Sequence, residues 1–178
     1  MQFTSRKLVS CDKGIVAVEF AFIAPVLILL FLGTIELCNA LICRAKVTTV
    51  AASAADLAAQ DKTITGAQVN DIFTALNAIM YPYPTSGSKI IITSVKGDPA
   101  HPGQYVVDWS VAQNATKHTT GAPIIVPAGL VTSGGSVILA ELSYTYTPPS
   151  NQIIHAPFTM SDQFYARPRQ SAFVSYTP

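Results

Sequence analysis

The sequence predicts an α+β protein in which one long N-terminal helix forms a membrane anchor and then a stalk for a small head. Three observations support this class. Residues 15–43 form a nearly unbroken apolar run, and a helical spacing of apolar residues continues to about Gln60. Beyond residue 90 the apolar period changes to that of strands. The head is therefore expected to contain a second helix packed on an antiparallel sheet of three or four strands.

Composition excludes some classes of function. The chain has 178 residues, a formal net charge of +1, 12% charged residues and 49% hydrophobic residues. It has no basic excess with which to bind a phosphate backbone, so no nucleic-acid partner is expected. The cysteines, Cys11, Cys38 and Cys43, all precede the head. Cys38 and Cys43 would lie on diverging faces of one helix, which does not suit a disulfide.

Residues 15–43 are predicted to cross a membrane once. At about 1.5 Å per residue, a helix of this length exceeds the roughly 30 Å hydrocarbon core. Its clearly polar residues are Glu19, Thr34, Glu36 and Asn39. Glu36 and Asn39 either mark the outer interface or contact a partner membrane protein. The basic residues before the span are Arg6, Lys7 and Lys13. Their excess favours a cytoplasmic N-terminus, although basic residues at 44 and 46 reduce the bias.

A glycine and a glutamate at the start of the apolar run form the most informative motif. Gly14 precedes Glu19 by little more than one helical turn. A carboxylate within an apolar helix costs of the order of a few kcal/mol, so it indicates a function. Gly14 offers an unhindered backbone to a peptidase, and we predict cleavage between Gly14 and Ile15. The new ammonium of Ile15 and the carboxylate of Glu19 can then pair within one subunit or between subunits.

Other targeting signals compete with this interpretation. A cleavable secretory signal needs a small-residue site after the apolar run, and Asn39-Ala40-Leu41 offers little there. Leu8-Val9-Ser10-Cys11 fits a lipoprotein box, but no apolar segment of sufficient length precedes it. An uncleaved signal anchor, with Glu19 at headgroup depth, is the main alternative.

The residues around the motif carry a resemblance to a known family. It rests on residues 14–21, 24–27 and 33–36, and residues 165–169 are similar to the way these proteins often end. The chain resembles the TadE-like pseudopilins of the tight-adherence (Tad/Flp) pilus system, which have a type IV pilin-like signal. The resemblance implies that a prepilin peptidase cuts after Gly14 and that Glu19 serves assembly. Phe20 and the long C-terminal region favour the minor, pseudopilin type over the short major pilins.

The resemblance also implies partners, location and a pilin-like fold. The protein would cross the bacterial inner membrane once, with a cytoplasmic N-terminus and a periplasmic head, and incorporation in the pilus stays open. Its partners would be prepilin peptidase, other pilins and pseudopilins, the inner-membrane secretion platform and the lipid bilayer. It would take part in assembling a Tad/Flp-type pilus for adhesion or secretion. The alternatives are a signal-anchored periplasmic interaction domain and, less favoured, a tethered hydrolase.

The chain divides into four predicted segments. These are a basic leader at 1–14, the transmembrane part of the stem helix at 15–43, its amphipathic continuation at 44–60 and the head at 61–178. The apolar stripe of the continuation consists of Val47, Val50, Ala51, Ala54, Leu57 and Ala58. We expect this stripe to pack on the chain's own head, and the alternative is a partner helix.

The elements of the head follow from local patterns. Thr65 is predicted to cap a second helix, which the Tyr81-Pro82-Tyr83-Pro84 segment ends. The apolar positions of this helix are Val69, Ile72, Phe73, Leu76, Ile79 and Met80. Strands are predicted at 90–95, 105–111, 138–146 and 164–166, with a long loop at 114–135.

No catalytic, metal or cofactor site is predicted, and no small-molecule substrate. His101, His118 and His155 lie in expected loops without paired spacing, and no P-loop or nucleophile elbow is present. We therefore predict that the protein is not an enzyme. The hydrolase alternative would require a convergent cluster, such as His155 with Asp162 and a serine.

Overall fold

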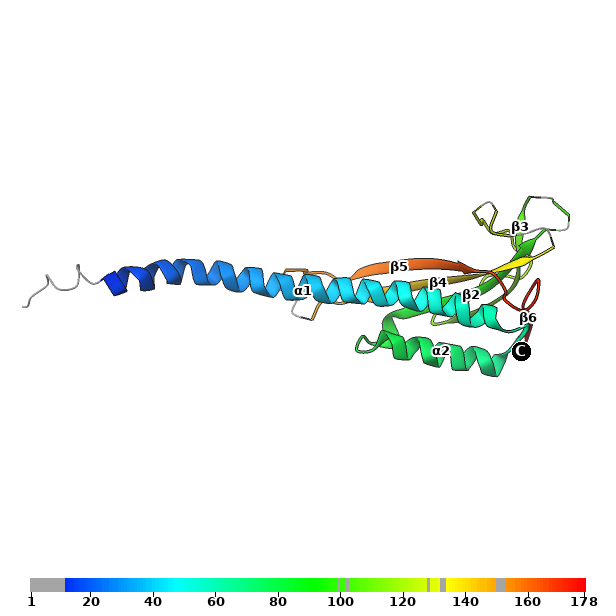
Figure 1. Ribbon diagram of the computed structural model, residues 1–178, viewed down its shortest axis with the longest axis horizontal. Helices are drawn as coiled ribbons and strands as arrows, with labels where there is room; N and C mark the ends of the chain where they lie inside the picture. The colour runs from blue at the N-terminus through cyan, green and yellow to red at the C-terminus, as the bar shows by residue number, and fades with distance from the viewer. Residues whose placement is uncertain (1–11, 99, 102, 128, 132–133, 150–152) are drawn as a thin grey trace, which may run out of the picture.

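The computed structural model describes residues 12–98, 100–101, 103–127, 129–131, 134–149 and 153–178 (Figure 1). Residues 1–11 of the predicted leader, which include Arg6, Lys7 and Cys11, lie outside the described residues. The elements in order are α1 (Asp12–Gln60), β1 (Thr63–Thr65), α2 (Gly66–Met80), the 3₁₀ helix η2 (Thr85–Gly87), β2 (Ser88–Gly97), β3 (Tyr105–Gln113), β4 (Ser136–Tyr146), β5 (Phe158–Ala166) and β6 (Ser175–Thr177). The predicted α+β class is confirmed.

Helix α1 continues without interruption from the free stem into the head (Figure 1). Every large apolar side chain of residues 15–32 is exposed, whereas Glu36, Ala40 and Cys43 are buried. The predicted stripe is buried in the head except for Leu57, which is half-buried. The stripe packs on β4, β5 and α2 of the same chain, so the expectation that it serves the chain's own head is confirmed.

Four antiparallel strands form the main sheet in the order β3-β2-β4-β5. Alternate side chains of these strands join α1 and α2 in one apolar core, whose sheet residues include Ile90, Trp109, Ile138 and Leu142. The opposite face of the sheet is covered by the connection from β3 to β4, at the end of the head away from the free stem (Figure 1). That cover consists of Val126 with partly buried Ile124, Leu130 and Val131, packed on Val95, Val137 and Leu139.

Helix α2 begins as its sequence predicts. The hydroxyl of Thr65 accepts the N–H of Gln68, and the Gln68 side chain accepts the N–H of Thr65, which completes a capping box. The helix then runs back along α1 toward the free stem and ends at Met80 (Figure 1). Lys46 of α1 fixes that end, because its Nζ donates to the carbonyl of Ile79 over 2.8 Å.

The strands differ from the predicted ones in two ways. Strand β5 begins at Phe158 rather than at residue 164, because pairing with β4 extends it through polar residues that hide its alternation. The parallel pair of β1 with β6 was not predicted from the sequence. Each of these strands is only three residues long, so neither contains enough of a period-two pattern to be seen locally.

Candidate functional site at the junction of stem and head

The residues predicted for processing and assembly lie together on the free part of α1. The position that a Cβ on Gly14 would take has no atom within 4 Å. Ile15 and Glu19 are exposed on the same apolar stretch. By length and composition, the helix that contains them is apolar enough to cross a membrane, and it is the one such helix in the described part of the chain.

Glu36 lies where the free stem meets the head, and it is only 2% exposed. Its Oε2 accepts the backbone N–H groups of Ile153 over 3.0 Å and of Ile154 over 2.9 Å. These amides belong to the connection between β4 and β5, which crosses the stem at this level (Figure 1). A hydrogen bond from an N–H group to a carboxylate is about twice as strong as a hydrogen bond between neutral groups. Glu36 therefore attaches this connection to the stem.

A second contact of the same connection lies one turn nearer the membrane end of α1. The side chain of Ile153 passes over Gly33, with its Cγ1 3.6 Å from the place of a Cβ on Gly33. Ile153 also lines an apolar groove with Pro25, Ile28, Leu29 and Leu32. A Cβ at position 33 would make ordinary van der Waals contact with Ile153, so the connection lies directly against the helix here.

A tyrosine cluster closes the other side of the junction. The hydroxyl of Tyr83 donates to the carbonyl of Asn39 over 2.8 Å. The ring centroid of Tyr83 is 6.3 Å from that of Tyr144 and 6.1 Å from that of Tyr146, both at edge-on angles. Tyr146 in turn meets Phe158 at 5.4 Å. The cluster joins α1, β4, β5 and the segment after α2.

The environment of these tyrosines raises the pKa of their phenols. Burial is the main cause, and it raises the pKa of Tyr144 to about 12. Burial also raises the pKa of Tyr83 and of Tyr146. The neighbouring Cys43 and Glu36 add to the upward shift of the pKa of Tyr146. The phenols are therefore neutral at the junction over the ordinary pH range.

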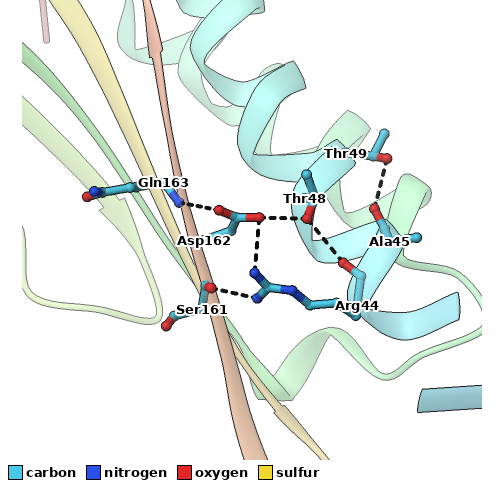
Figure 2. Close-up of polar contacts among 7 residues, drawn as sticks. All are labelled: Arg44, Ala45, Thr48, Thr49, Ser161, Asp162 and Gln163. Carbon is cyan, nitrogen blue, oxygen red and sulfur yellow. Dashed lines mark hydrogen bonds and ion pairs between the residues drawn. The ribbon is translucent and has the colours of Figure 1, made fainter. Parts of the chain in front are cut away.

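A polar clasp holds α1 to β5 farther along the helix (Figure 2). The guanidinium of Arg44 donates to the carbonyl of Ser161 over 2.6 Å and lies 3.5 Å from the carboxylate of Asp162. Thr48 donates to that carboxylate over 2.6 Å, and the N–H of Gln163 binds its other oxygen over 3.0 Å. Side chains of α1 thus bind the Asp162 carboxylate, and this contact holds β5 on the helix.

The histidines singled out in the sequence lie in separate parts of the head. His101 has its Nδ1 2.7 Å from Asp98 in the turn after β2, and His118 has its Nε2 2.6 Å from Glu141 of β4. Within the part of the chain that the structure describes, no group of three or more His, Cys, Asp and Glu residues could hold a metal ion.

Sequence reasoning found some of these residues and missed others. It singled out Gly14, Glu19, Glu36 and Asn39, and the structure brings the last two together at the junction. The side chain of Glu36 binds its own chain, whereas Asn39 contributes its backbone carbonyl. Sequence reasoning missed Tyr83 and the Ile153 connection. The uncharged composition of the segments that contain them was the available signal.

Together these features define a class of protein, which is a single-anchor protein with a pilin-like division into stem and head. The family model described as TadE-like protein matches residues 14–56. The predicted resemblance is thereby confirmed for the stem, including Gly14, Glu19 and Glu36. No match to a curated protein or to a solved structure was found. Residues 14–56 are less than half of the chain, so the match shows a likeness to TadE-like proteins in the stem and in the adjoining part of α1.

Proposed function

We propose that the chain is a membrane-anchored pseudopilin, or minor pilin, which takes part in assembling a Tad/Flp-type pilus for adhesion or secretion. The observation that carries the proposal is the placing of Gly14 and Glu19 on the exposed apolar end of α1, inside the segment that matches TadE-like proteins. A carboxylate in this position is unfavourable in lipid unless it finds a positive partner.

Cleavage after Gly14 would create that partner. The new ammonium of Ile15 lies one helical turn from Glu19, and the same group on a neighbouring subunit is equally suitable. An ion pair is much stronger in lipid than in water because the effective dielectric constant is low. The pair therefore sets the register between neighbouring stems, and prepilin peptidase becomes the first partner of the chain.

The exposed stem is suited to further contacts within the membrane. The side chains of residues 15–32 make no part of the head core, so they are free to meet lipid or the stems of other pilins and pseudopilins. The basic residues before the span favour a cytoplasmic N-terminus in the bacterial inner membrane, with the head in the periplasm. The inner-membrane secretion platform is the partner through which such a subunit would be inserted in, or would prime, a pilus.

The cleavage step is tested by the mass of the native protein. In cells that contain a prepilin peptidase, intact-mass analysis should show Ile15 as the first residue. Gly14→Phe should leave only the full-length chain, because the bulky side chain blocks the peptidase. Gly33→Ala, a substitution of another glycine on the same helix, is the matched control and should be processed normally. Wild-type protein that retains Met1 in these cells would favour an uncleaved signal anchor instead.

The assembly step is tested by co-purification from envelope membranes. Glu19→Gln keeps the size of the side chain but removes its charge, so recovery of other pilins and pseudopilins with the protein should fall sharply. Glu141→Gln removes a carboxylate from the head and should leave recovery unchanged. Equal recovery for wild type and Glu19→Gln would remove Glu19 from the assembly contact.

A further inference from the structure

The end of the head that faces the free stem is formed by two connections, from α2 to β2 and from β4 to β5 (Figure 1). Tyr81 on the first connection is 78% exposed. On the second, Ile153 is 42% exposed and Phe158, the first residue of β5, is 39% exposed. We call these three side chains the proximal rim. The head also exposes Ile125, Phe164 and Phe173 elsewhere, so exposure alone does not single out the proximal rim, and its charge and depth matter more.

The two connections that form the proximal rim carry no formal charge, and the nearby cation is Lys46 of α1, which donates to the carbonyl of Ile79. The segment 72–88, which contains Tyr81, has no Lys, Arg, Asp or Glu, and neither does the segment 147–160, which contains Ile153 and Phe158. The opposite end of the head carries Lys62 after α1 and Lys96 and Asp98 at the end of β2. Uncharged connections with an exposed tyrosine and a lysine close by are typical of a membrane interface.

The depth of the proximal rim follows from the length of the anchor. At about 1.5 Å per residue, the helix from Ile15 to Ile35 is about 30 Å long, which equals the thickness of the hydrocarbon core. The hydrocarbon on the head side therefore ends close to Gly33 and Glu36. Ile153 contacts Gly33 and continues the groove lined by Leu29 and Leu32, so it lies beside the last turns of the span.

We propose that the proximal rim is a second membrane contact, seated in the lipid leaflet on the head side, with Ile153 reaching the acyl chains. The proposal rests on the membrane anchor and not on the pilus role, so it goes beyond the proposed function. Glu36 makes this contact possible. It lies at the boundary of the hydrocarbon, and the N–H groups of Ile153 and Ile154 cover its charge while it holds Ile153 on the stem.

Lipid is the occupant that the structure favours over a second copy of the chain. The anchor and the proximal rim belong to one chain, and α1 fixes the distance between them. The lipid leaflet therefore lies beside Ile153 whenever the anchor is inserted, whereas a second copy would have to be recruited.

Quenching of tryptophan fluorescence by brominated lipid tests the proposal. The full chain is reconstituted at a low ratio of protein to lipid in phosphatidylcholine vesicles that carry bromine on their acyl chains. Trp109, the one native tryptophan, lies buried in the head and supplies a constant background. One tryptophan is added at a time, by Ile153→Trp in the rim, Phe22→Trp in the stem or Ile125→Trp. Ile125 is 94% exposed on the connection from β3 to β4, near the start of β3.

The expected result is a large loss of the added emission for Phe22→Trp and Ile153→Trp, and no loss for Ile125→Trp. Quenching at Phe22→Trp without quenching at Ile153→Trp would overturn the second contact while leaving the anchor in place. Failure of quenching at both positions would overturn the anchor as well. The pilus role is tested separately, by the mass of the chain and by co-purification.

Two further measurements control for misfolding of the variant and for contacts between copies of the chain. Phe158→Trp replaces one aromatic ring by another, so it provides a rim position whose substitution preserves the fold, and its emission should also be quenched. Quenching at Ile153→Trp should be independent of the ratio of protein to lipid. Protection of that tryptophan as the ratio rises would assign the rim to contacts between copies of the chain and would overturn the lipid contact.

Discussion

Glu36 illustrates at the residue scale what a sequence shows about a buried charge and what it does not. Its position in an apolar helix marked it as unusual, because burying a carboxylate is unfavourable. The structure supplies partners from backbone N–H groups at a sequence separation of 117 and 118 residues. Backbone donors are the same for every residue type, so no side-chain pattern could have revealed them.

Removing the Glu36 carboxylate should destabilise the head. Glu36→Ala removes the acceptor of two partly buried N–H groups, at about 1–3 kcal/mol each, so the free energy of unfolding should fall by roughly 2–6 kcal/mol. The measurement is denaturant unfolding of the full chain in detergent micelles. Asn39→Ala is the control, because Tyr83 binds the backbone carbonyl of Asn39, which alanine retains. A loss for Glu36→Ala no larger than that of the control would contradict this role.

The tyrosine cluster should make the stability of the head depend on alkaline pH. The pKa of Tyr144 is about 12 in the folded head, against an ordinary value of 10.0. A raised pKa means that the folded state holds the proton more tightly, so the stabilisation is complete below pH 10 and is lost as pH rises toward 12. The unfolding temperature should fall across this window, and it should fall less steeply for Tyr144→Phe. Parallel curves for wild type and Tyr144→Phe would contradict a contribution of Tyr144 to this pH dependence.

At the scale of elements, α1 combines two environments in one helix. Its first half has apolar side chains on every face, as a helix in lipid requires, and its second half has a stripe of small side chains toward the head. Both halves were predictable because each depends only on spacing along the chain. The alanines of the stripe allow α1 to lie close to the sheet and to α2.

Enlarging the small-residue stripe should force α1 away from the sheet. Ala54 has no exposed surface in the core, so Ala54→Leu should lower the free energy of unfolding by about 1–3 kcal/mol. Ala45→Leu, at an exposed position on the same helix, is the matched control and should have little effect. Thermal unfolding of the two variants in micelles gives the comparison. Similar melting of both variants would mean that the stripe tolerates larger side chains.

Elements that depend on distant partners were predicted poorly. The middle of β5 contains Ser161, Asp162 and Gln163, which give no alternation of apolar and polar residues, and β4 supplies the pairing that makes it a strand. The clasp of Arg44 with Asp162 is likewise invisible to local patterns (Figure 2). In contrast, the capping box of α2 was predictable, because Thr65 and Gln68 are three residues apart.

At the scale of the whole molecule, the boundary between stem and head is sharp. The large apolar side chains of residues 15–32 are exposed, and the core begins with Glu36, Ala40 and Cys43. The predicted membrane part of the stem helix runs to residue 43, and its last turns include Ala40 and Cys43, which also pack in the core of the head. Composition alone cannot separate a helix in lipid from a helix in a protein core, because both are apolar.

The sharp boundary predicts where the chain can be shortened. A chain that begins at Gly33 should keep a folded, monomeric head, because it loses exposed apolar side chains and no core residue. A chain that begins at Thr48 should unfold, because it lacks Ala40, Cys43 and Val47, which are all buried. Circular dichroism with thermal melting, together with size-exclusion chromatography, measures both outcomes. An unfolded chain from Gly33, or a stable one from Thr48, would show that the boundary is misplaced.

The continuity of α1 also determines how motion passes through the molecule. Between Gly33 and Gln60 the helix is about 40 Å long, and it has no break at which the head could swivel independently. If the anchor leans by about 20°, a common inclination for a membrane helix, the far tip of the head shifts sideways by about 14 Å. The chain thus behaves as a stiff lever, which converts a small reorientation inside the bilayer into a long displacement at its outer end.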